Sequence, residues 1–401
     1  MPDVYFKKTI DFYHGGQTLQ FHVSQDLFSS HQIDFGTARL LRSLDETQTF
    51  HKILDLGCGY GPLGLTLKKM NAESIVHLVD RDALAVEYTR QNAALNQIAD
   101  VFVYGSLGYD DVQAQDFDLI ISNIPGKAGE TVIASLLRDA CHFLKPDGLV
   151  AIVVVAPLET TVANILDDPD IEIVFQETRS GHAIFHYRFS EVYRDKLRPF
   201  ENSFAAGLYH REAVTISAGN LTFPMQTARG LPEFDTLSYR TELMIEGLFA
   251  LRGSKIDHLI VFNPGQGHIP LVLWKLARPT TAITLVDRDL LSLRYTRYNL
   301  IQNGCPESQI TTAYQVGLSP QAEGQVVDLI AGIVREEEGP AAAELLVQQA
   351  AAQLAPGGTL WVTAGSTPVT RLEKAVQSGK QWRVEKRKRD KRISLLVMRR
   401  K

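Results

Sequence analysis

A glycine-rich segment, LDLGCGYGPLG (54–64), has the residue types and spacing of a ligand-binding loop. Glycines let the backbone turn tightly and approach a ligand closely; here they are Gly57, Gly59 and Gly61. Asp55 stands two residues before the first of them, and Asp80 ends the next apolar run. A carboxylate at that place can accept hydrogen bonds from both hydroxyls of a ribose. The pattern therefore predicts a site for a cofactor that contains a nucleoside.

The spacing alone fits two kinds of cofactor. The last two of these glycines, with Gly64, also match the G-x-G-x-x-G pattern of dinucleotide sites, with an acidic residue about 20 positions further on. Three features favour S-adenosylmethionine: Asp55 can meet its cationic amino group, Asn-x-Pro follows at 123–125, and a Lys-Pro-Asp-Gly turn lies at 145–148. We therefore expect S-adenosylmethionine. The alternatives are a dinucleotide site and a tight turn that binds no ligand.

The elements that must position these residues alternate between β and α. Continuous apolar runs are expected to be strands buried on both faces: 52–56, 74–80, 100–105, 117–122 and 149–155. Stretches with apolar residues three and four positions apart are expected to be helices: 62–70, 83–96 and 131–144. This alternation predicts an α/β fold with a doubly wound, mostly parallel sheet, in which ligands bind beyond the carboxyl ends of the strands.

The chain contains this pattern twice. VDRDALAVEYTRQNAALNQ (79–97) is repeated as VDRDLLSLRYTRYNLIQNG (286–304). The other matching pairs are 33–41 with 234–244 (Asp34 opposite Asp235, Arg39 opposite Arg240), 52–67 with 258–273, 118–126 with 328–336, and 144–148 with 354–358. Solenoid repeats have periods of about 20–50 residues, so a repeat this long indicates two homologous domains. We expect them at 1–198 and 199–401, with a junction at 194–212.

The second copy lacks the residues to which we assign chemistry. Val261 stands opposite Asp55, Asn263 opposite Gly57, and Ile333 opposite Asn123. Asp287 remains opposite Asp80, but a single Asp at a strand end is more often a cap than a ligand. The sequence therefore predicts one catalytic domain followed by a degenerate, non-catalytic one.

Residues 20–190 resemble the methyltransferase small domain family of class I S-adenosylmethionine-dependent methyltransferases. The resemblance rests on FSSHQIDFGTARLL, KILDLGCGYGPLGL, VDRDALAVEYTRQNAALN, FDLIISNIPGKAG and LKPDG. Within it, the small-subunit ribosomal RNA guanine-N2 methyltransferases also carry two such domains in tandem, although with the degenerate copy first. The resemblance implies two tandem Rossmann-like domains. The cofactor-binding residues expected are Thr37, Asp55, Gly57, Cys58, Gly59, Gly61, Asp80, Arg81, Gly105, Ser106 and Asn123.

The acceptor loop departs from the family. Its members carry Asn-Pro-Pro followed by Phe or Tyr, whereas this chain reads Asn123-Ile124-Pro125-Gly126. In the family mechanism the Asn oxygen and the next carbonyl accept hydrogen bonds from an exocyclic amine, which turns the nitrogen lone pair toward the methyl group. The catalytic residues expected are Asn123, Ile124 and Pro125.

Gly126 cannot stack on a base, a contact worth about 1–3 kcal/mol. Either another ring replaces the missing one, with Tyr60 and His182 as candidates, or the acceptor is not a flat base, or the loop is only a turn.

Composition limits the remaining possibilities. The chain has 401 residues, a net charge of −5 and a pI of about 6.1, which argues against binding polyanions over its whole surface. Three widely spaced cysteines, Cys58, Cys141 and Cys305, predict neither a disulfide framework nor a clustered metal site. The longest apolar run, 149–158, is shorter than the ~20 residues of a membrane span. We expect a soluble, cytoplasmic protein.

A basic segment lies near the C-terminus, in RVEKRKRDKRISLLVMRRK (383–401). Lys386, Arg387, Lys388 and Arg389 could hold RNA phosphates from a loop or strand entry, or form one side of a solvated hairpin. The function predicted is methyl transfer to a guanine exocyclic amine in ribosomal RNA. The alternatives are methylation of a protein side chain or small molecule, and a non-catalytic RNA-binding or assembly module that retains the cofactor.

Overall fold

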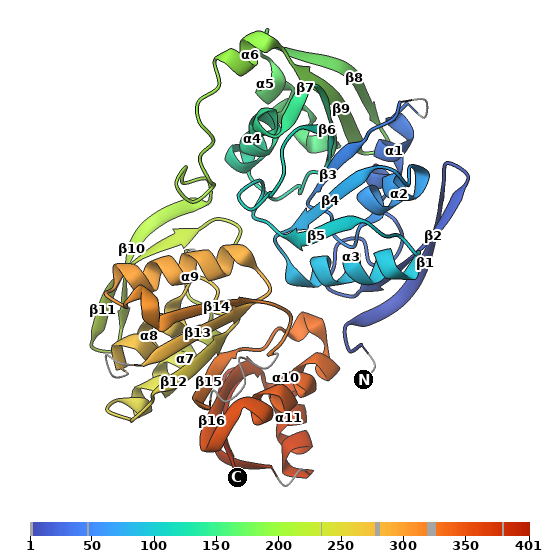
Figure 1. The fold of residues 1–401 in the computed structure, drawn as a ribbon. Coiled ribbons are helices and arrows are strands. Elements are labelled where there is room, and N and C mark those ends of the chain that lie inside the picture. Colours follow the sequence, from blue (N-terminus) through green and yellow to red (C-terminus); the bar gives the residue numbers. More distant parts are fainter. Residues whose placement is uncertain (1–2, 46–47, 234, 277–280, 319–325, 379–380) are drawn as a thin grey trace. The chain divides into compact units, whose positions relative to one another are not determined.

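The computed structural model describes residues 3–45, 48–233, 235–276, 281–318, 326–378 and 381–401. The chain divides into two compact units. One is Phe6–Tyr209, and the other comprises His210–Lys401 with the first residues of the chain. Each unit contains a seven-stranded sheet covered by helices (Figure 1). The predicted class, two tandem Rossmann-like α/β domains with mostly parallel sheets, is confirmed.

The sheet of the first unit has the strand order β5-β4-β3-β6-β7-β9-β8. Its strands are β3 (Lys52–Leu56), β4 (Ile75–Asp80), β5 (Val101–Gly105), β6 (Phe117–Asn123), β7 (Leu144–Val155), β8 (Ile171–Arg179) and β9 (His182–Phe189). The first five are parallel, and β9 runs antiparallel to both its neighbours. The order reverses at β3, which lies between β4 and β6, so the carboxyl ends of these three strands adjoin where α/β sheets bind ligands.

The helices of the first unit largely follow the predicted ranges. They are α1 (Phe35–Ser43), α2 (Pro62–Met70), α3 (Ala83–Leu95), α4 (Glu130–Arg138), α5 (Glu159–Leu166) and α6 (Glu191–Asp195), with 3-10 turns η1 (Asp139–His142) and η2 (Ala156–Leu158). The helix predicted at 131–144 therefore ends early. The turn predicted at 145–148 is the irregular start of β7, where a Cβ on Gly148 would lie 2.9 Å from the Phe117 carbonyl oxygen.

The second unit repeats the strand order as β14-β13-β12-β15-β16-β18-β17. These strands are β12 (His258–Phe262), β13 (Ala282–Asp287), β14 (Ile310–Tyr314), β15 (Val327–Ile333), β16 (Leu354–Gly365), β17 (Trp382–Asp390) and β18 (Ile393–Arg400). Its helices are α7 (Tyr239–Leu248), α8 (His268–Leu276), α9 (Leu290–Gln302), α10 (Pro340–Gln353) and α11 (Ser366–Ser378), with 3-10 turns η3 (Phe249–Leu251), η4 (Glu307–Gln309) and η5 (Glu336–Glu338).

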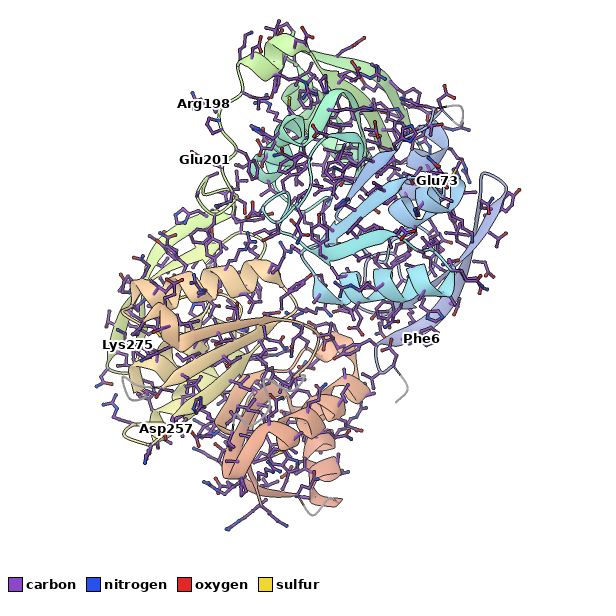
Figure 2. The ribbon with its side chains drawn as sticks, in the orientation of Figure 1. Phe6, Glu73, Arg198, Glu201, Asp257 and Lys275 are labelled. Carbon is purple, nitrogen blue, oxygen red and sulfur yellow. The ribbon has the colours of Figure 1, made fainter. Side chains whose placement is uncertain are left out.

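A hairpin that the sequence did not predict precedes each sheet. It is β1 (Phe6–His14) with β2 (Gln17–Ser24) in the first unit, and β10 (His210–Ala218) with β11 (Leu221–Ala228) in the second. The expected junction at 194–212 therefore includes the end of α6 and the start of β10. Between them the chain is irregular, and Arg198 and Glu201 are exposed there (Figure 2).

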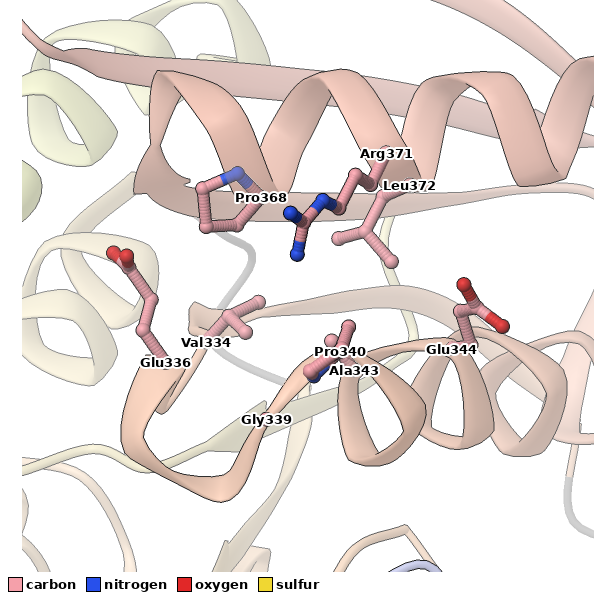
Figure 3. A pocket seen from close by; sticks show the side chains of 9 residues that line it. All are labelled: Val334, Glu336, Gly339, Pro340, Ala343, Glu344, Pro368, Arg371 and Leu372. Carbon is pink, nitrogen blue, oxygen red and sulfur yellow. The ribbon is translucent and has the colours of Figure 1, made fainter.

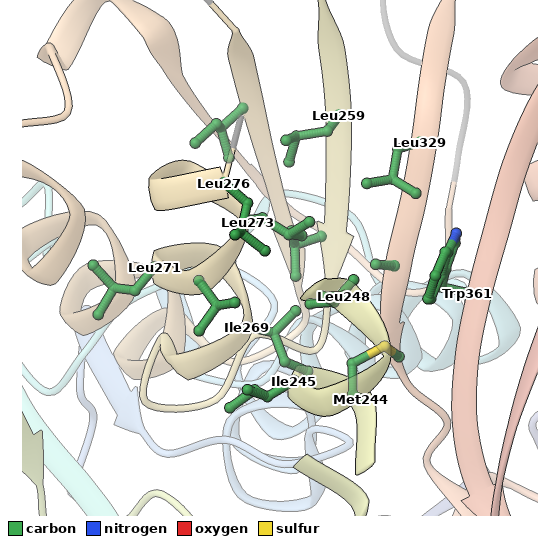
Figure 4. Close-up of a cluster of buried hydrophobic side chains, with 14 of the residues drawn as sticks. Met244, Ile245, Leu248, Leu259, Ile269, Leu271, Leu273, Leu276, Leu329 and Trp361 are labelled. Carbon is green, nitrogen blue, oxygen red and sulfur yellow. The ribbon is translucent and has the colours of Figure 1, made fainter. Parts of the chain in front are cut away.

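One hydrophobic cluster of the second unit shows how the helices are held on the sheet. Side chains from α7 and α8 pack against the face formed by β12, β15 and β16 (Figure 4). They include Met244, Leu248, Ile269 and Leu273 on the helices, with Leu259, Leu329 and Trp361 on the strands. Burying one such side chain stabilises the fold by about 1.5–3 kcal/mol.

Residues that are identical in the two copies have structural roles. Asp82 and Asp289 cap α3 and α9, since their carboxylates accept from Leu84 N and Leu291 N at 2.9 and 3.0 Å. Asn92 accepts from His22 N of the hairpin at 2.7 Å and donates to the Tyr60 carbonyl of the glycine loop at 2.9 Å.

Asn299 makes the same pair of contacts in the second unit, with Gln226 N and the Gln266 carbonyl. The repeat therefore preserves the attachment of the hairpin to the glycine loop.

Candidate active site

The glycine loop between β3 and α2 leaves open space above its backbone. Gly57 and Gly59 have φ values of 78° and 58°, and a Cβ on either would meet no atom within 4 Å. Gly61, with φ of 93°, is the N-cap of α2. These are left-handed conformations that glycine adopts without strain, so the loop presents bare backbone to an incoming ligand.

Asp55 lies fully buried beneath this loop. Its Oδ2 accepts a 2.8 Å hydrogen bond from Gly64 N, in the first turn of α2. Among the described residues its Oδ1 has no partner. Burial raises the pKa of this carboxyl to about 7. A buried carboxylate oxygen without a donor is costly, and the ammonium group of S-adenosylmethionine would supply both the donor and the charge.

Asp80 stands at the end of β4, on the other side of the loop. Its Oδ2 accepts from Gly59 N and its Oδ1 from Asp82 N, both at 2.9 Å. These bonds orient the carboxylate at the edge of the open loop, where the sequence predicts a contact with ribose.

The remaining predicted donor-site residues lie around the same strand ends. Gly105 ends β5 opposite Asp80 in the register, and half-buried Arg81 follows Asp80 directly. Cys58 is buried, which raises its thiol pKa well above the usual range. Ser106 is buried as well, and its hydroxyl donates to the Gly108 carbonyl at 2.7 Å.

Asn123, at the end of β6, is held in one orientation by α1. Its Nδ2 donates to Asp34 Oδ2 and Thr37 Oγ1, both at 3.0 Å. An ionised carboxylate can only accept, so the amide nitrogen faces Asp34 and Oδ1 faces away from it. Asp34 also caps α1 by accepting from Thr37 N at 3.1 Å. Sequence reasoning did not include Asp34 in the site, although an Asp directly before a helix is a recognisable cap.

The rest of the acceptor loop turns outward from the sheet. Ile124 is buried and donates its N–H to the Val153 carbonyl of β7 at 2.9 Å. Pro125 and Gly126 are exposed, and the Pro125 carbonyl accepts from Ala128 N at 3.1 Å. The loop is thus a short turn that leaves position 126 open to solvent.

Tyr60 does not replace the missing aromatic residue. Tyr60 is only 2% exposed, its ring packs edge-on against Phe21, and its hydroxyl donates to the Ser29 carbonyl. That suggestion is wrong, because the faces of the ring are covered by the protein. His182 is half-buried and lies beside the ring of Phe35 at the start of α1.

In the second unit, the positions that correspond to the expected cofactor site hold side chains that contact one another. Asn263, opposite Gly57, donates from Nδ2 to the Ile333 carbonyl at 2.9 Å and so crosses from the loop to the end of β15. Arg335, opposite Pro125, forms a 2.5 Å ion pair with Asp287, which also accepts from the Ser292 hydroxyl at 2.7 Å.

The acceptor position of the second unit is also filled. Glu336, opposite Gly126, pairs with Arg240 at 2.7 Å and accepts from Gly365 N at 2.7 Å. A cavity of about 100 Å³ opens beside it, where Pro368 and Arg371 of α11 face Val334 and the start of α10 (Figure 3). This cavity involves none of the residues opposite the donor site.

The helix caps correct one detail of the repeat alignment. Ser238 caps α7 by accepting from Thr241 N, as Asp34 caps α1. Ser238, and not Asp235, is therefore the counterpart of Asp34, and Arg240 is not the counterpart of Arg39. Phe234, the first residue of the matched segment, lies outside the described residues.

The basic segment forms an edge strand and not a loop. Lys386, Arg387, Lys388 and Arg389 lie on β17, which pairs with β18. Arg387 pairs with Glu373 of α11 at 2.5 Å, and Lys388 pairs with Glu246 of α7. Two of the four charges are thus neutralised within the unit, as in the hairpin alternative.

Metal clusters and membrane spans are both absent from the described part of the chain. Its residues contain no group of three or more His, Cys, Asp or Glu placed to hold a metal ion. Within the same residues, no helix is both long and apolar enough to span a membrane.

A solved structure with the same architecture is the T. Thermophilus 16S rRNA N2 G1207 methyltransferase in complex with AdoMet and guanosine. It superimposes with a TM-score of 0.68 at 14% identity and covers 98% of both chains. At this identity the likeness shows the fold, including the tandem arrangement of two sheets.

Sequence comparison identifies the family. Uncharacterized protein YbxB of Bacillus subtilis (strain 168) is 34% identical over 149 residues, 37% of this chain and 74% of that protein. The ribosomal RNA small subunit methyltransferase C of Hahella chejuensis is 37% identical over 140 residues, and the large subunit methyltransferase G of Shewanella halifaxensis is 33% identical over 147.

The last two matches cover 34% of this chain in each case, but only 40% and 35% of those relatives. Residues 18–181 match the methyltransferase small domain. The buried Oδ1 of Asp55, which has no hydrogen-bond partner in the described part of the chain, and the open glycine loop fit the cofactor of that family. The chain therefore belongs to the methyltransferase small domain family and is an S-adenosylmethionine-dependent methyltransferase.

Proposed function

We propose that the first unit methylates the exocyclic amine of a guanine in ribosomal RNA. The names of the relatives support RNA as the acceptor, because they act on small or large ribosomal subunit RNA. The observation that carries the proposal is the orientation of Asn123. Its Nδ2 is held by Asp34 and Thr37, so Oδ1 is the atom that can receive an amine N–H.

In this mechanism the protein aligns the two reactants. Asn123 Oδ1 and the Ile124 carbonyl accept the two N–H bonds of the amine, so that its lone pair points toward the donor. The cofactor supplies an electrophilic methyl group on a sulfonium leaving group. With S-adenosylmethionine held by Asp55 and the glycine loop, the methyl group would pass to the amine nitrogen as its bond to sulfur breaks, and the nitrogen would then release one proton to water. Holding the reactants in this geometry can supply much of the acceleration.

We infer that residues 1–198 form the catalytic domain and 199–401 a degenerate domain that binds no S-adenosylmethionine. Two contacts support this inference. Asn263 fills the place of the open Gly57, and Arg335 engages the carboxylate of Asp287, which corresponds to Asp80. An incoming cofactor would have to break both contacts and would find Val261 in place of Asp55.

The test is transfer of labelled methyl groups to separated RNA, protein and small-molecule fractions from cells that lack the protein. Label in ribosomal RNA, recovered as N2-methylguanosine, is the expected result. Label confined to protein or metabolites would show that the acceptor is not RNA. This outcome is included because Gly126 lacks the family's aromatic ring. Cofactor binding without transfer to any fraction would leave only a binding role.

A further inference from the structure

We propose that Phe35, supported by His182, forms the face on which the target base stacks. This inference rests on the proposed function and assigns a substrate-binding residue to it. Phe35 is the first residue of α1 and directly follows Asp34, whose carboxylate binds Asn123. A base whose amine meets Asn123 therefore lies close to the start of α1.

The exposure of Phe35 is unusual for its surroundings. Phe35 is 50% exposed, whereas the next six residues of α1, from Gly36 to Leu41, are all buried. An exposed aromatic face gains little from folding, since it remains in water. Single-stranded bases are held by aromatic faces of this kind, and stacking tolerates any base because each has a π-face.

His182 fixes the ring from one side. The centroids of the two rings are 6.3 Å apart and their planes are tilted by 43°. His182 packs directly on the first turn of α1, because a Cβ on Gly36 would lie 2.6 Å from His182 Cδ2. The absence of a side chain at Gly36 therefore seats the imidazole beside Phe35. Aromatic pairs of this spacing are favourable in tilted arrangements.

The same group of residues reaches the position where the family carries its own aromatic. His182 pairs with Val155 in the register of β7 and β9. A Cβ on Gly126 would lie 3.4 Å from Val155 Cγ2, which is ordinary contact. Contacts therefore connect Asn123 through Asp34 to Phe35, and from there through His182 and Val155 to Gly126. Phe35 offers an exposed ring beside an acceptor loop that carries none.

The test compares Phe35→Ala with Phe102→Ala in steady-state methylation of RNA. Phe102 is the matched control, because it is 52% exposed and its ring lies 4.7 Å from His77, but it belongs to the edge strand β5. For Phe35→Ala we expect KM for RNA to rise about 10-fold or more, with cofactor Kd unchanged. Phe35→Tyr should retain near wild-type KM, and Phe102→Ala should match wild type.

Two further variants separate stacking from folding. Phe35→Leu keeps an apolar side chain without a flat face, so its KM should rise as in the Ala variant while its Tm stays near wild type. Gly126→Tyr restores the family's ring, and combined with Phe35→Ala it should recover part of the RNA affinity. Wild-type KM in Phe35→Leu and Phe35→Ala would overturn this inference. Absence of RNA methylation by the wild-type protein would instead overturn the proposed function.

Discussion

Asn123 and its two hydrogen-bond partners make the clearest prediction at the scale of single residues. Asn123→Ala should abolish methylation while changing cofactor Kd by less than about threefold, because the amide interacts mainly with the reacting amine. Asp34→Asn should also lower kcat, since an amide at position 34 can donate as well as accept and no longer dictates which way Asn123 faces. Single-turnover assays and calorimetry check both. Unchanged turnover in Asn123→Ala would reduce the loop to a turn.

The buried carboxyl of Asp55 predicts a pH dependence of cofactor binding. Burial raises its pKa to about 7, so below that pH the group is protonated and neutral in the free protein. Affinity for the cationic amino group should therefore strengthen as pH rises through about 7. In the free protein the same shift lowers folding stability over the interval from pH 3.8 toward 7, because only the unfolded chain ionises there.

Calorimetric titrations between about pH 5.5 and about pH 7.5 measure this dependence. Asp55→Asn should bind S-adenosylmethionine weakly and with a flat profile over that range. A wild-type profile that is already flat would show that Asp55 does not receive the amino group.

At the scale of elements, Asn92 fastens the N-terminal hairpin to the glycine loop. It is fully buried, and Asn92→Ala leaves His22 N and the Tyr60 carbonyl without this partner. Each buried group left unpaired costs about 1–3 kcal/mol, so urea unfolding should show a large loss of stability. Glu87→Ala, an exposed position on the same helix, should change stability by less than about 0.5 kcal/mol. Equal stability of the two variants would contradict this role.

The elements that could be predicted are those whose signal is local. The runs 52–56 and 117–122 are mostly apolar because β3 and β6 are buried on both faces, and the glycines after β3 have positive φ. The hairpins β1–β2 and β10–β11 were not predicted, since the two copies share few identical residues there. Their common feature is attachment to Asn92 or Asn299, a contact between distant segments.

The parts of the site that escaped prediction depend on tertiary contacts. No spacing in the sequence shows that Arg335 pairs with Asp287, about 50 positions away along the chain, or that Tyr60 is turned into the core. Asp235 was aligned with Asp34, whereas the residue that caps α7 as Asp34 caps α1 is Ser238; Asp and Ser serve equally well as N-caps, so matching residue types did not reveal this. Residue types thus indicated the chemistry of the first copy, while burial decided which side chains are available.

At the scale of the whole molecule, the asymmetry between the copies predicts one cofactor per chain. Calorimetry of the full chain should give a stoichiometry near one. Asp80→Ala should weaken binding, because a hydrogen bond to a charged acceptor contributes about 1.5–3 kcal/mol. Asp287→Ala should leave affinity unchanged, since its partners are Arg335 and Ser292 of the protein itself. A stoichiometry near two, or loss of binding in Asp287→Ala, would mean that the second unit holds cofactor.

The basic strand β17 carries positive side chains that are paired with carboxylates and others that are not. Arg387 and Lys388 pair with Glu373 and Glu246, whereas Lys386 and Arg389, both exposed, have no ion pair among the described residues. A charge already paired with a carboxylate contributes less to holding a phosphate. If the second unit grips RNA, Lys386 and Arg389 should therefore carry more of the affinity than their neighbours.

Replacing Lys386 and Arg389 together with Gln should weaken RNA binding and flatten its salt dependence, by about 0.7–0.9 log–log units for each phosphate that the protein no longer neutralises. The matched double variant, Arg387→Gln with Lys388→Gln, should have a smaller effect on both quantities. Turnover at saturating RNA and cofactor Kd should stay at wild-type values in both variants, because phosphate contacts position the RNA and we assign the methyl transfer to the first unit. RNA Kd measured across a series of salt concentrations checks this. A wild-type salt slope in the variant without Lys386 and Arg389 would show that neither side chain contacts RNA phosphates, and β17 would then not be part of the RNA-binding surface.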